Sequence, residues 1–265
     1  MSSVIEKWFL PIEDNNSFIR SIADGRKLFG ADMSLFGDIV DDNQKQYYLT
    51  SQHLSDVNSD SELIARVSAL KMIFHGMMYI YHPFDYKKIS INSAEKFENG
   101  KFERRCDVDK VILPPDPFSF SLMNKKFTSR NDLVCGELGI IVFSSRYSVT
   151  MREMLMYAGF NGLSYASVYG LLDWIKHEAK ERELEWADFF EVSKTKLNDL
   201  TATCNEPYLT GVMSRHGGPG NPNTPTGKYV SIHDAIHTVC AGCRKLFAII
   251  MEEIDVEKKI TDLLF

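Results

Sequence analysis

The chain has 265 residues, of which 44% are hydrophobic and 25% charged, and its formal net charge is −6. This length and apolar content suffice for a sizeable core in one or two domains. The acidic balance argues against the long uniform basic surface that dominates non-specific binding to duplex nucleic acid, so any nucleic-acid contact is expected to be local.

The cysteines and the N-terminal residues indicate the compartment. Five cysteines stand at positions 106, 135, 204, 240 and 243, an odd number that is too small for a disulfide scaffold in a chain of this size. Residues 1–8 contain no basic segment followed by an apolar run. Apolar runs elsewhere are interrupted within about a dozen positions, which is too short for a membrane-spanning helix. We therefore expect a cytoplasmic protein without membrane contacts.

Turn residues and short alternating runs predict two hairpins in the first part of the chain. Residues 32–40 and 46–50 flank the polar segment 41–44 and predict the first hairpin. Residues 86–93 and 101–112 flank Glu98-Asn99-Gly100 and predict the second, because Asn-Gly tolerates the positive φ angles of a tight turn.

A helix is predicted between the hairpins, over residues 60–81, where apolar residues recur at helical spacing behind the polar segment 58–61. Pro114-Pro115-Asp116-Pro117 cannot continue a helix or a central strand. We place the end of an α+β module of two hairpins and a helix near residue 125, and expect a helical domain over residues 126–265.

Helical periodicity dominates the second half of the chain. The sequence pattern of residues 132–147 fits a helix and a buried strand equally well. The predicted fold class is α+β, with a small hairpin-rich sheet and one helix followed by an α-helical bundle. The candidate helices of the bundle cover residues 150–158, 164–182, 186–204 and 231–265.

The most informative segment is the Gly-rich loop that contains Ser214-Arg215-His216-Gly217-Gly218. Arginine supplies a permanent planar cation for phosphate or carboxylate, and histidine can exchange a proton near neutral pH. Ser214, Gly217 and Gly218 are candidate ligand-binding residues, because glycines let backbone N–H groups approach an anion. Alternatively, Arg215 pairs with an acid of the preceding helix and His216 caps a helix end, in which case the glycines only form a surface loop.

Asn205 ends a predicted helix just before this loop. Its amide could hold a backbone carbonyl or a substrate group at the same site. The alternative is a helix C-cap in the left-handed conformation, which asparagine often adopts. We treat Arg215, His216 and Asn205 as the candidate catalytic residues.

A second pattern, His237-x-x-Cys240-x-x-Cys243, contains residue types that bind zinc. On one continuous helix, positions six apart are rotated away from each other, and no second Cys-x-x-Cys or His pair completes a tetrahedral site. We interpret the cysteines as small buried apolar residues. No metal and no other cofactor is expected.

Several segments in order along the chain resemble a group of bacterial proteins that pair a small N-terminal α+β region with a helical C-terminal region. The latter is similar to a divergent HEPN-type helical domain, a fold found in ribonucleases of toxin–antitoxin and anti-phage abortive-infection systems and in non-catalytic relatives. HEPN ribonucleases typically separate Arg and His by about four to six residues, whereas Arg215 and His216 are adjacent. The segments that carry the resemblance are residues 47–51, 168–175, 203–205, 214–217 and 231–235.

The resemblance implies a HEPN-like, RNA-binding or RNA-cleaving protein of a bacterial anti-phage defence system. Cleavage would proceed by metal-independent attack of a 2′-hydroxyl, with Arg215, His216 and Asn205 at the site, and a homodimer or a protein partner from a defence operon is expected. The alternative is a non-catalytic sensor or scaffold subunit of a defence complex. Exposed methionine and aromatic residues on the last helix would favour that alternative, and a nucleotide bound near Gly217-Gly218 would indicate small-nucleotide recognition instead.

Overall fold

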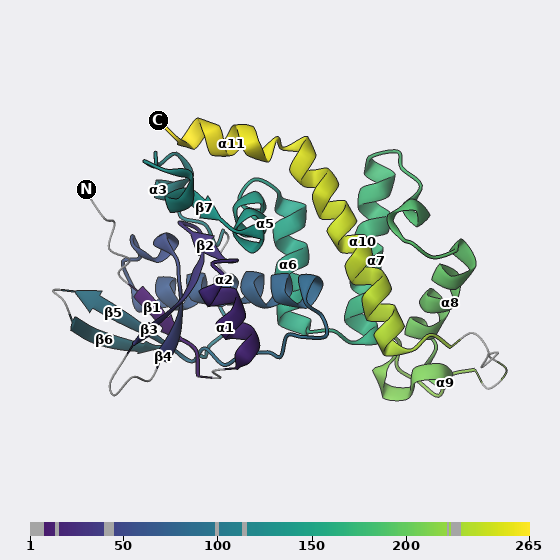
Figure 1. Cartoon of the computed structure of the whole chain (residues 1–265). Helices are drawn as coiled ribbons and strands as arrows, with labels where there is room; N and C mark the ends of the chain where they lie inside the picture. Colours follow the sequence, from purple (N-terminus) through teal and green to yellow (C-terminus); the bar gives the residue numbers. More distant parts are fainter. Residues whose placement is uncertain are drawn as a thin grey trace. The chain divides into compact units, whose positions relative to one another are not determined.

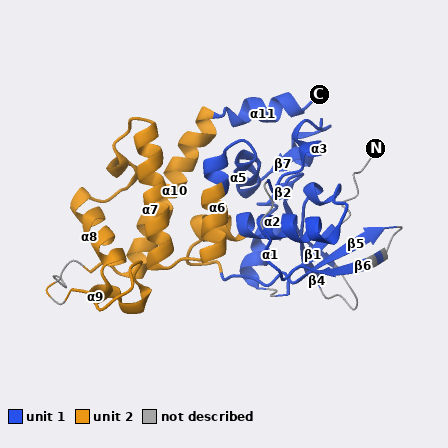
Figure 2. Ribbon diagram, turned by 180° about the vertical axis from the view of Figure 1, so that it is seen from behind, with its two compact units in different colours: residues 1–74, 87–152, 254–265 blue, residues 75–86, 153–253 orange. Residues whose placement is uncertain are grey.

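The computed structural model describes residues 8–13, 16–39, 45–98, 101–112, 116–221, 223 and 229–265. These residues form two compact units (Figure 2). Unit 1 comprises residues 1–74, 87–152 and 254–265, and unit 2 comprises residues 75–86 and 153–253. The sequence predicts a single boundary near residue 125, whereas in this division residues 126–152 and 254–265 also belong to unit 1, and residues 75–86 belong to unit 2.

Unit 1 contains a five-stranded antiparallel sheet in the order β3-β4-β1-β5-β6 (Figure 1). A two-stranded sheet joins β2 to β7. The mixed α+β class predicted from the sequence is therefore confirmed. The strands are β1 (Trp8–Pro11), β2 (Phe29–Gly30), β3 (Ser34–Ile39), β4 (Lys45–Thr50), β5 (Ser93–Glu98), β6 (Lys101–Asp107) and β7 (Val134–Cys135).

Both predicted hairpins are present. In the first, β3 pairs with β4, and the turn residues 40–44 lie outside the described part of the chain. In the second, β5 pairs with β6, so its first strand covers 93–98 and not the predicted 86–93. The predicted Asn-Gly turn, Asn99-Gly100, lies outside the described residues. Residues 86–92 form an irregular segment whose apolar side chains Tyr86, Ile89 and Ile91 are buried.

Helix α2 (Asp60–Tyr81) forms as the periodicity predicts. The hydroxyl of Ser59 accepts a hydrogen bond from the backbone N–H of Glu62, and the Glu62 carboxylate accepts one from the N–H of Asn58. This reciprocal arrangement satisfies donors that a helix start leaves unpaired. Among the described helices, α2 is the one long and apolar enough to cross a membrane, and 72% of its most apolar window is buried inside the protein, as in a core helix.

The other helices of unit 1 are short, and two of them settle the ambiguous segment 132–147, which contains helix α4, strand β7 and helix α5 in succession. Gly136 separates β7 from α5 with φ of 78°, and a Cβ there would lie 2.4 Å from the carbonyl oxygen of Lys27. Only glycine fits that position without displacing the backbone. These helices are α1 (Ser17–Asp24), α3 (Phe120–Met123), α4 (Arg130–Leu133), α5 (Glu137–Ser145) and α11 (Val256–Leu263).

Unit 2 consists of helices and loops. The predicted helix 164–182 forms as α7, which starts after a capping box between Ser164 and Ser167. The predicted helix 150–158 lies within α6, through which the division into units passes at residue 152. The helices in this part of the chain are α6 (Val149–Asn161), α7 (Tyr165–Glu181), α8 (Lys194–Asn205), α9 (Pro207–Thr210) and α10 (Ile232–Glu253).

Two segments were each predicted as one continuous helix, and this prediction is wrong for both. The segment 186–204 breaks into a 3-10 turn at Trp186–Phe189 and α8, because the Ser193 hydroxyl accepts from the N–H of Lys196 and starts a new helix. The segment 231–265 breaks between α10 and α11 at Asp255, whose φ is 51° and whose carboxylate caps α11. In both cases a side-chain cap interrupts a periodic apolar pattern that by itself shows no break.

The core of unit 1 contains a buried charged cluster. The Asp32 carboxylate accepts from the Nε2–H of His53 at 2.7 Å and pairs with the Arg146 guanidinium at 3.1 Å, and the side chains of His53 and Arg146 are fully buried. The backbone N–H of Ser119 donates to Nδ1 of His53 at 2.9 Å, which leaves the imidazole neutral.

The pKa values of this cluster follow from its burial. Burial alone would raise the pKa of Asp32, but the Arg146 charge and the His53 hydrogen bond outweigh it and hold that pKa below its usual value. Burial lowers the pKa of His53 more than Asp32 raises it. The folded cluster is therefore one ion pair with a neutral histidine.

Replacing Arg146 with methionine removes the cation while keeping a side chain of similar length. We expect the free energy of unfolding to fall by about 3–5 kcal/mol, because the Asp32 carboxylate stays buried without its partner. Urea unfolding followed by circular dichroism measures this change. Arg130→Met is the matched control, since Arg130 pairs with Glu257 at the surface and its loss should cost about 1 kcal/mol or less. Equal losses in the two variants would contradict the role assigned to the buried pair.

Candidate functional site

The end of α8 positions the loop that carries the predicted site. Leu197, Leu200 and Cys204 of α8 are buried. The Thr203 hydroxyl donates to the carbonyl of Asp199 at 2.8 Å and accepts from the N–H of Val230 at 3.1 Å. The C-terminal end of α8 is therefore joined directly to Val230, two residues before α10 and on the far side of the loop.

The Glu206 side chain holds the loop at a second point. Its carboxylate accepts from the N–H of Tyr208, at the start of α9, and from the N–H of Asn221, at 3.0 and 2.8 Å. Gly220 lies against the same turn with φ of 72°, and a Cβ there would come within 2.3 Å of the Tyr208 nitrogen. The Glu206 carboxylate thus binds the start of α9 and also Asn221, fifteen positions further along the chain than Glu206.

Arg215 is held by its backbone and by its side chain. Its N–H donates to the carbonyl of Cys204 at 2.8 Å. The guanidinium lies 4.3 Å from the centroid of the Tyr169 ring and 3.6 Å from the Asp173 carboxylate, and both charged side chains are about two-fifths exposed. Tyr169 and Asp173 are four residues apart in α7, so they lie on one face of that helix. An acid does pair with Arg215, but it comes from α7 and not from the preceding helix α8.

Asn205 is the last residue of α8 and precedes the C-cap, Glu206. Its φ is not positive, so the left-handed C-cap considered for it from the sequence is wrong. Its side-chain oxygen Oδ1 is buried and accepts no hydrogen bond from a described residue. Buried amide oxygens are nearly always paired. Asn205 therefore has an acceptor that remains available beside the residue whose carbonyl binds Arg215.

The remaining predicted residues are exposed on the loop. The Ser214 hydroxyl donates to the carbonyl of His216, and the side chain of His216 is exposed. A Cβ added to Gly217 or Gly218 would meet no atom within 4 Å, and Gly218 has φ of 125°. Within the described residues no hydrogen bond or ion pair joins the His216 imidazole to Arg215 or Asn205. The structure thus brings Arg215 and Asn205 to the end of α8 and leaves His216 beside them on the surface.

The sequence alone missed the aromatic side chains of this site. Lys176 lies 5.6 Å from the Tyr169 ring centroid and 4.9 Å from that of Trp186, so Tyr169 contacts two cations. Burial raises the pKa of Tyr157, which the Arg215 charge opposes, so Tyr157 belongs to the same neighbourhood. Tyr169 is only half-buried. The spacing of Tyr169, Asp173 and Lys176 on one helical face was the available signal.

The cysteines of α10 behave as the sequence predicts. Cys240 and Cys243 are fully buried, and His237 is exposed. Burial raises the pKa of the Cys240 thiol to about 12 and raises that of Cys243 as well. The described residues contain no group of three or more His, Cys, Asp or Glu side chains placed to hold a metal ion. The interpretation of Cys240 and Cys243 as buried apolar residues is confirmed.

Comparison with known proteins returns no match to a protein-family model, to a curated protein or to a solved structure. The resemblance to HEPN-type domains therefore remains a hypothesis.

Thiol accessibility provides a direct test of this packing. Cys106 and Cys135 are partly exposed, and Cys204, Cys240 and Cys243 are buried. We expect an aromatic disulfide reagent at pH 8 to modify at most two thiols in the folded protein and five after denaturation, because the reactive thiolate is suppressed by burial. Rapid native modification of a third thiol, which mass spectrometry would assign, would contradict the burial of these side chains.

Proposed function

We propose that unit 2 binds single-stranded RNA at the surface around Arg215 and cleaves it without a metal ion, as a HEPN-like ribonuclease of bacterial anti-phage defence. The observation that carries the proposal is the half-exposed Arg215 guanidinium on the Tyr169 ring, directly before an exposed histidine. Arginine and aromatic rings together suit RNA, because the cation binds phosphate and the rings stack on bases.

The chemistry follows from the residue types. The 2′-hydroxyl of one nucleotide attacks the adjacent phosphorus and forms a new P–O bond while the bond to the 5′-oxygen breaks, which yields a 2′,3′-cyclic phosphate and a 5′-hydroxyl. His216 accepts the proton of the attacking hydroxyl or supplies one to the leaving oxygen. Arg215 stabilises the charge that develops on the phosphoryl oxygens, and the Asn205 amide orients a reacting group.

Asp173 is a competitor of RNA for the Arg215 guanidinium. Its carboxylate lies 3.6 Å from the Arg215 guanidinium, so an RNA phosphate has to compete with it. An exposed pair of this kind is weak, and the negative charge density of an RNA strand can displace it. Binding should therefore be salt-dependent, as phosphate contacts generally are.

The test is cleavage of total tRNA and of a single-stranded oligoribonucleotide in EDTA. We expect wild type to cleave both, and Arg215→Ala and His216→Ala to lose at least about a hundredfold in rate, a typical loss for a general acid–base or charge-stabilising group. An oligonucleotide with 2′-deoxyribose throughout should bind, in fluorescence anisotropy, without being cut.

The matched controls are His237→Ala, which removes another exposed histidine of unit 2, and Arg130→Ala, which removes a surface arginine of unit 1. Both should retain the wild-type rate. Cleavage of the deoxy strand, or full activity in His216→Ala, would contradict the proposed mechanism.

A second candidate function, the non-catalytic sensor or scaffold subunit, is favoured by one observation. The segment α9 to residue 213 presents three exposed apolar side chains, with Val212 fully exposed and Tyr208 and Met213 about half exposed. Clustered exposed apolar residues are typical of protein contacts. The feature that the sequence suggested for this alternative is limited to one large exposed hydrophobic residue in the predicted last helix 231–265, Phe265, which is 70% exposed and follows α11.

Val212→Asp tests the scaffold function. If this segment forms a contact between copies, the variant should elute as a smaller species than wild type in light-scattering chromatography, because a buried unpaired carboxylate is costly. Val149→Asp is the control, since Val149 is exposed in unit 1. An unchanged mass together with intact RNA cleavage would favour the ribonuclease.

A further inference from the structure

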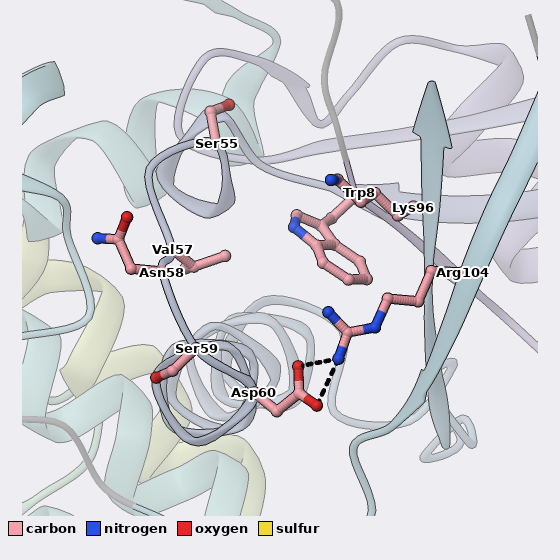
Figure 3. A pocket seen from close by; sticks show the side chains of 8 residues that line it. All are labelled: Trp8, Ser55, Val57, Asn58, Ser59, Asp60, Lys96 and Arg104. Carbon is pink, nitrogen blue, oxygen red and sulfur yellow. Dashed lines mark hydrogen bonds and ion pairs between the residues drawn. The ribbon is translucent and has the colours of Figure 1, made fainter. Parts of the chain in front are cut away.

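Unit 1 contains a pocket of about 210 Å³ that has no part in the site around Arg215 (Figure 3). One wall is residues 55–60, which lead into the first residue of α2. The opposite wall is a row of three side chains from adjacent strands. Trp8 of β1 pairs with Lys96 of β5, and Lys96 pairs with Arg104 of β6, so all three belong to one face of the sheet.

The pocket wall carries hydrogen-bonding groups without partners. Trp8 is only 5% exposed, and its indole N–H donates no hydrogen bond to a described residue. Figure 3 shows the indole nitrogen on the side of the pocket enclosed by Val57 and Ser59. The hydroxyl oxygen of Ser55 is buried and has no hydrogen-bond partner among the described residues. Buried polar groups are normally paired, so the Ser55 hydroxyl marks a place in the pocket wall where a ligand atom can be bound.

The charges around the pocket favour an anion. Nη2 of Arg104 donates to both carboxylate oxygens of Asp60, each at 2.5 Å, and both side chains are half exposed (Figure 3). Lys96 adds a second cation, 2.6 Å from Glu98. Asp60 is also the first residue of α2, where the helix dipole favours negative charge. The Asp60 carboxylate thus occupies the place that an external anion would take.

We propose that this pocket binds a phosphate monoester, with Arg104 and the Trp8 indole N–H as donors and the Asp60 carboxylate as an internal anion that the ligand displaces. Both donors come from the sheet, Trp8 from β1 and Arg104 from β6, and the cation of Lys96 in β5 lies between them in the same row. Arginine binds phosphate through two parallel N–H groups. The pocket is large enough to take part of the group that carries the phosphate.

Calorimetric titration of the full chain tests the proposal, with inorganic phosphate, uridine 5′-monophosphate and acetate as probes. We expect wild type to bind a phosphate probe and Arg104→Gln to bind it at least tenfold more weakly. Asp60→Asn should bind several-fold more tightly than wild type, because the competing carboxylate is gone. Trp8→Phe keeps an aromatic ring at this position, smaller than the indole, and loses the N–H, so it should bind several-fold more weakly.

The controls change the same chemical groups elsewhere in unit 1. Arg105→Gln neutralises the neighbouring exposed arginine, which lies beside Glu95, and Asp24→Asn opens the exposed pair with Lys45. Neither should change the affinity. Tighter binding of the nucleotide than of phosphate would assign the source as a nucleotide, and equal binding would assign it as the phosphate group alone.

Three results would overturn the proposal. The first is an absence of binding to both wild type and Asp60→Asn, with thermal unfolding showing that the variant is folded. The second is unchanged affinity in Arg104→Gln, and the third is acetate binding as tight as phosphate. A purely structural Arg104–Asp60 pair would give the first result.

Discussion

Unit 1 depends on the buried contact between Asp32 and Arg146. The two residues are 114 positions apart, and their pairing brings the segment before β3 against the end of α5. His53 and the Ser119 backbone extend the same network, so four segments distant in sequence have to be in place together. Because a buried carboxylate without its cation is costly, this network disfavours any arrangement that leaves one of the four segments out.

The two candidate ligand sites share one electrostatic feature. In each, an arginine near the surface already pairs with a carboxylate, Arg215 with Asp173 and Arg104 with Asp60. Such a pair keeps the guanidinium oriented in the absence of a ligand, and it makes binding a competition between an internal and an external anion. Since exposed pairs contribute little to stability, the exchange costs the fold little, and ligands with more negative charge than a carboxylate are favoured.

The loop after α8 shows how a surface site is given a defined shape. Glu206 and Thr203 hold the two ends of the loop, and the backbone of Arg215 is tied to α8. Between these contacts, Gly217 and Gly218 remain open to solvent. The arrangement holds Arg215 by its backbone and its side chain, and it leaves the His216 side chain exposed.

The sequence by itself determined the α+β class, both hairpins, α2 and α7. The signals for these elements are helical periodicity, Asn-Gly turns and capping serines, and each of them acts over only a few residues. The same reasoning selected Arg215 and Asn205. The breaks in the two long predicted helices come from local caps at Ser193 and Asp255, which the apolar periodicity does not reveal. Only the tertiary structure decided that Tyr169 and Asp173 hold Arg215, and that Trp8, Asp60 and Arg104 share a pocket. Those outcomes depend on contacts between residues about 40 or more positions apart, and no local pattern carries information about which distant side chains meet.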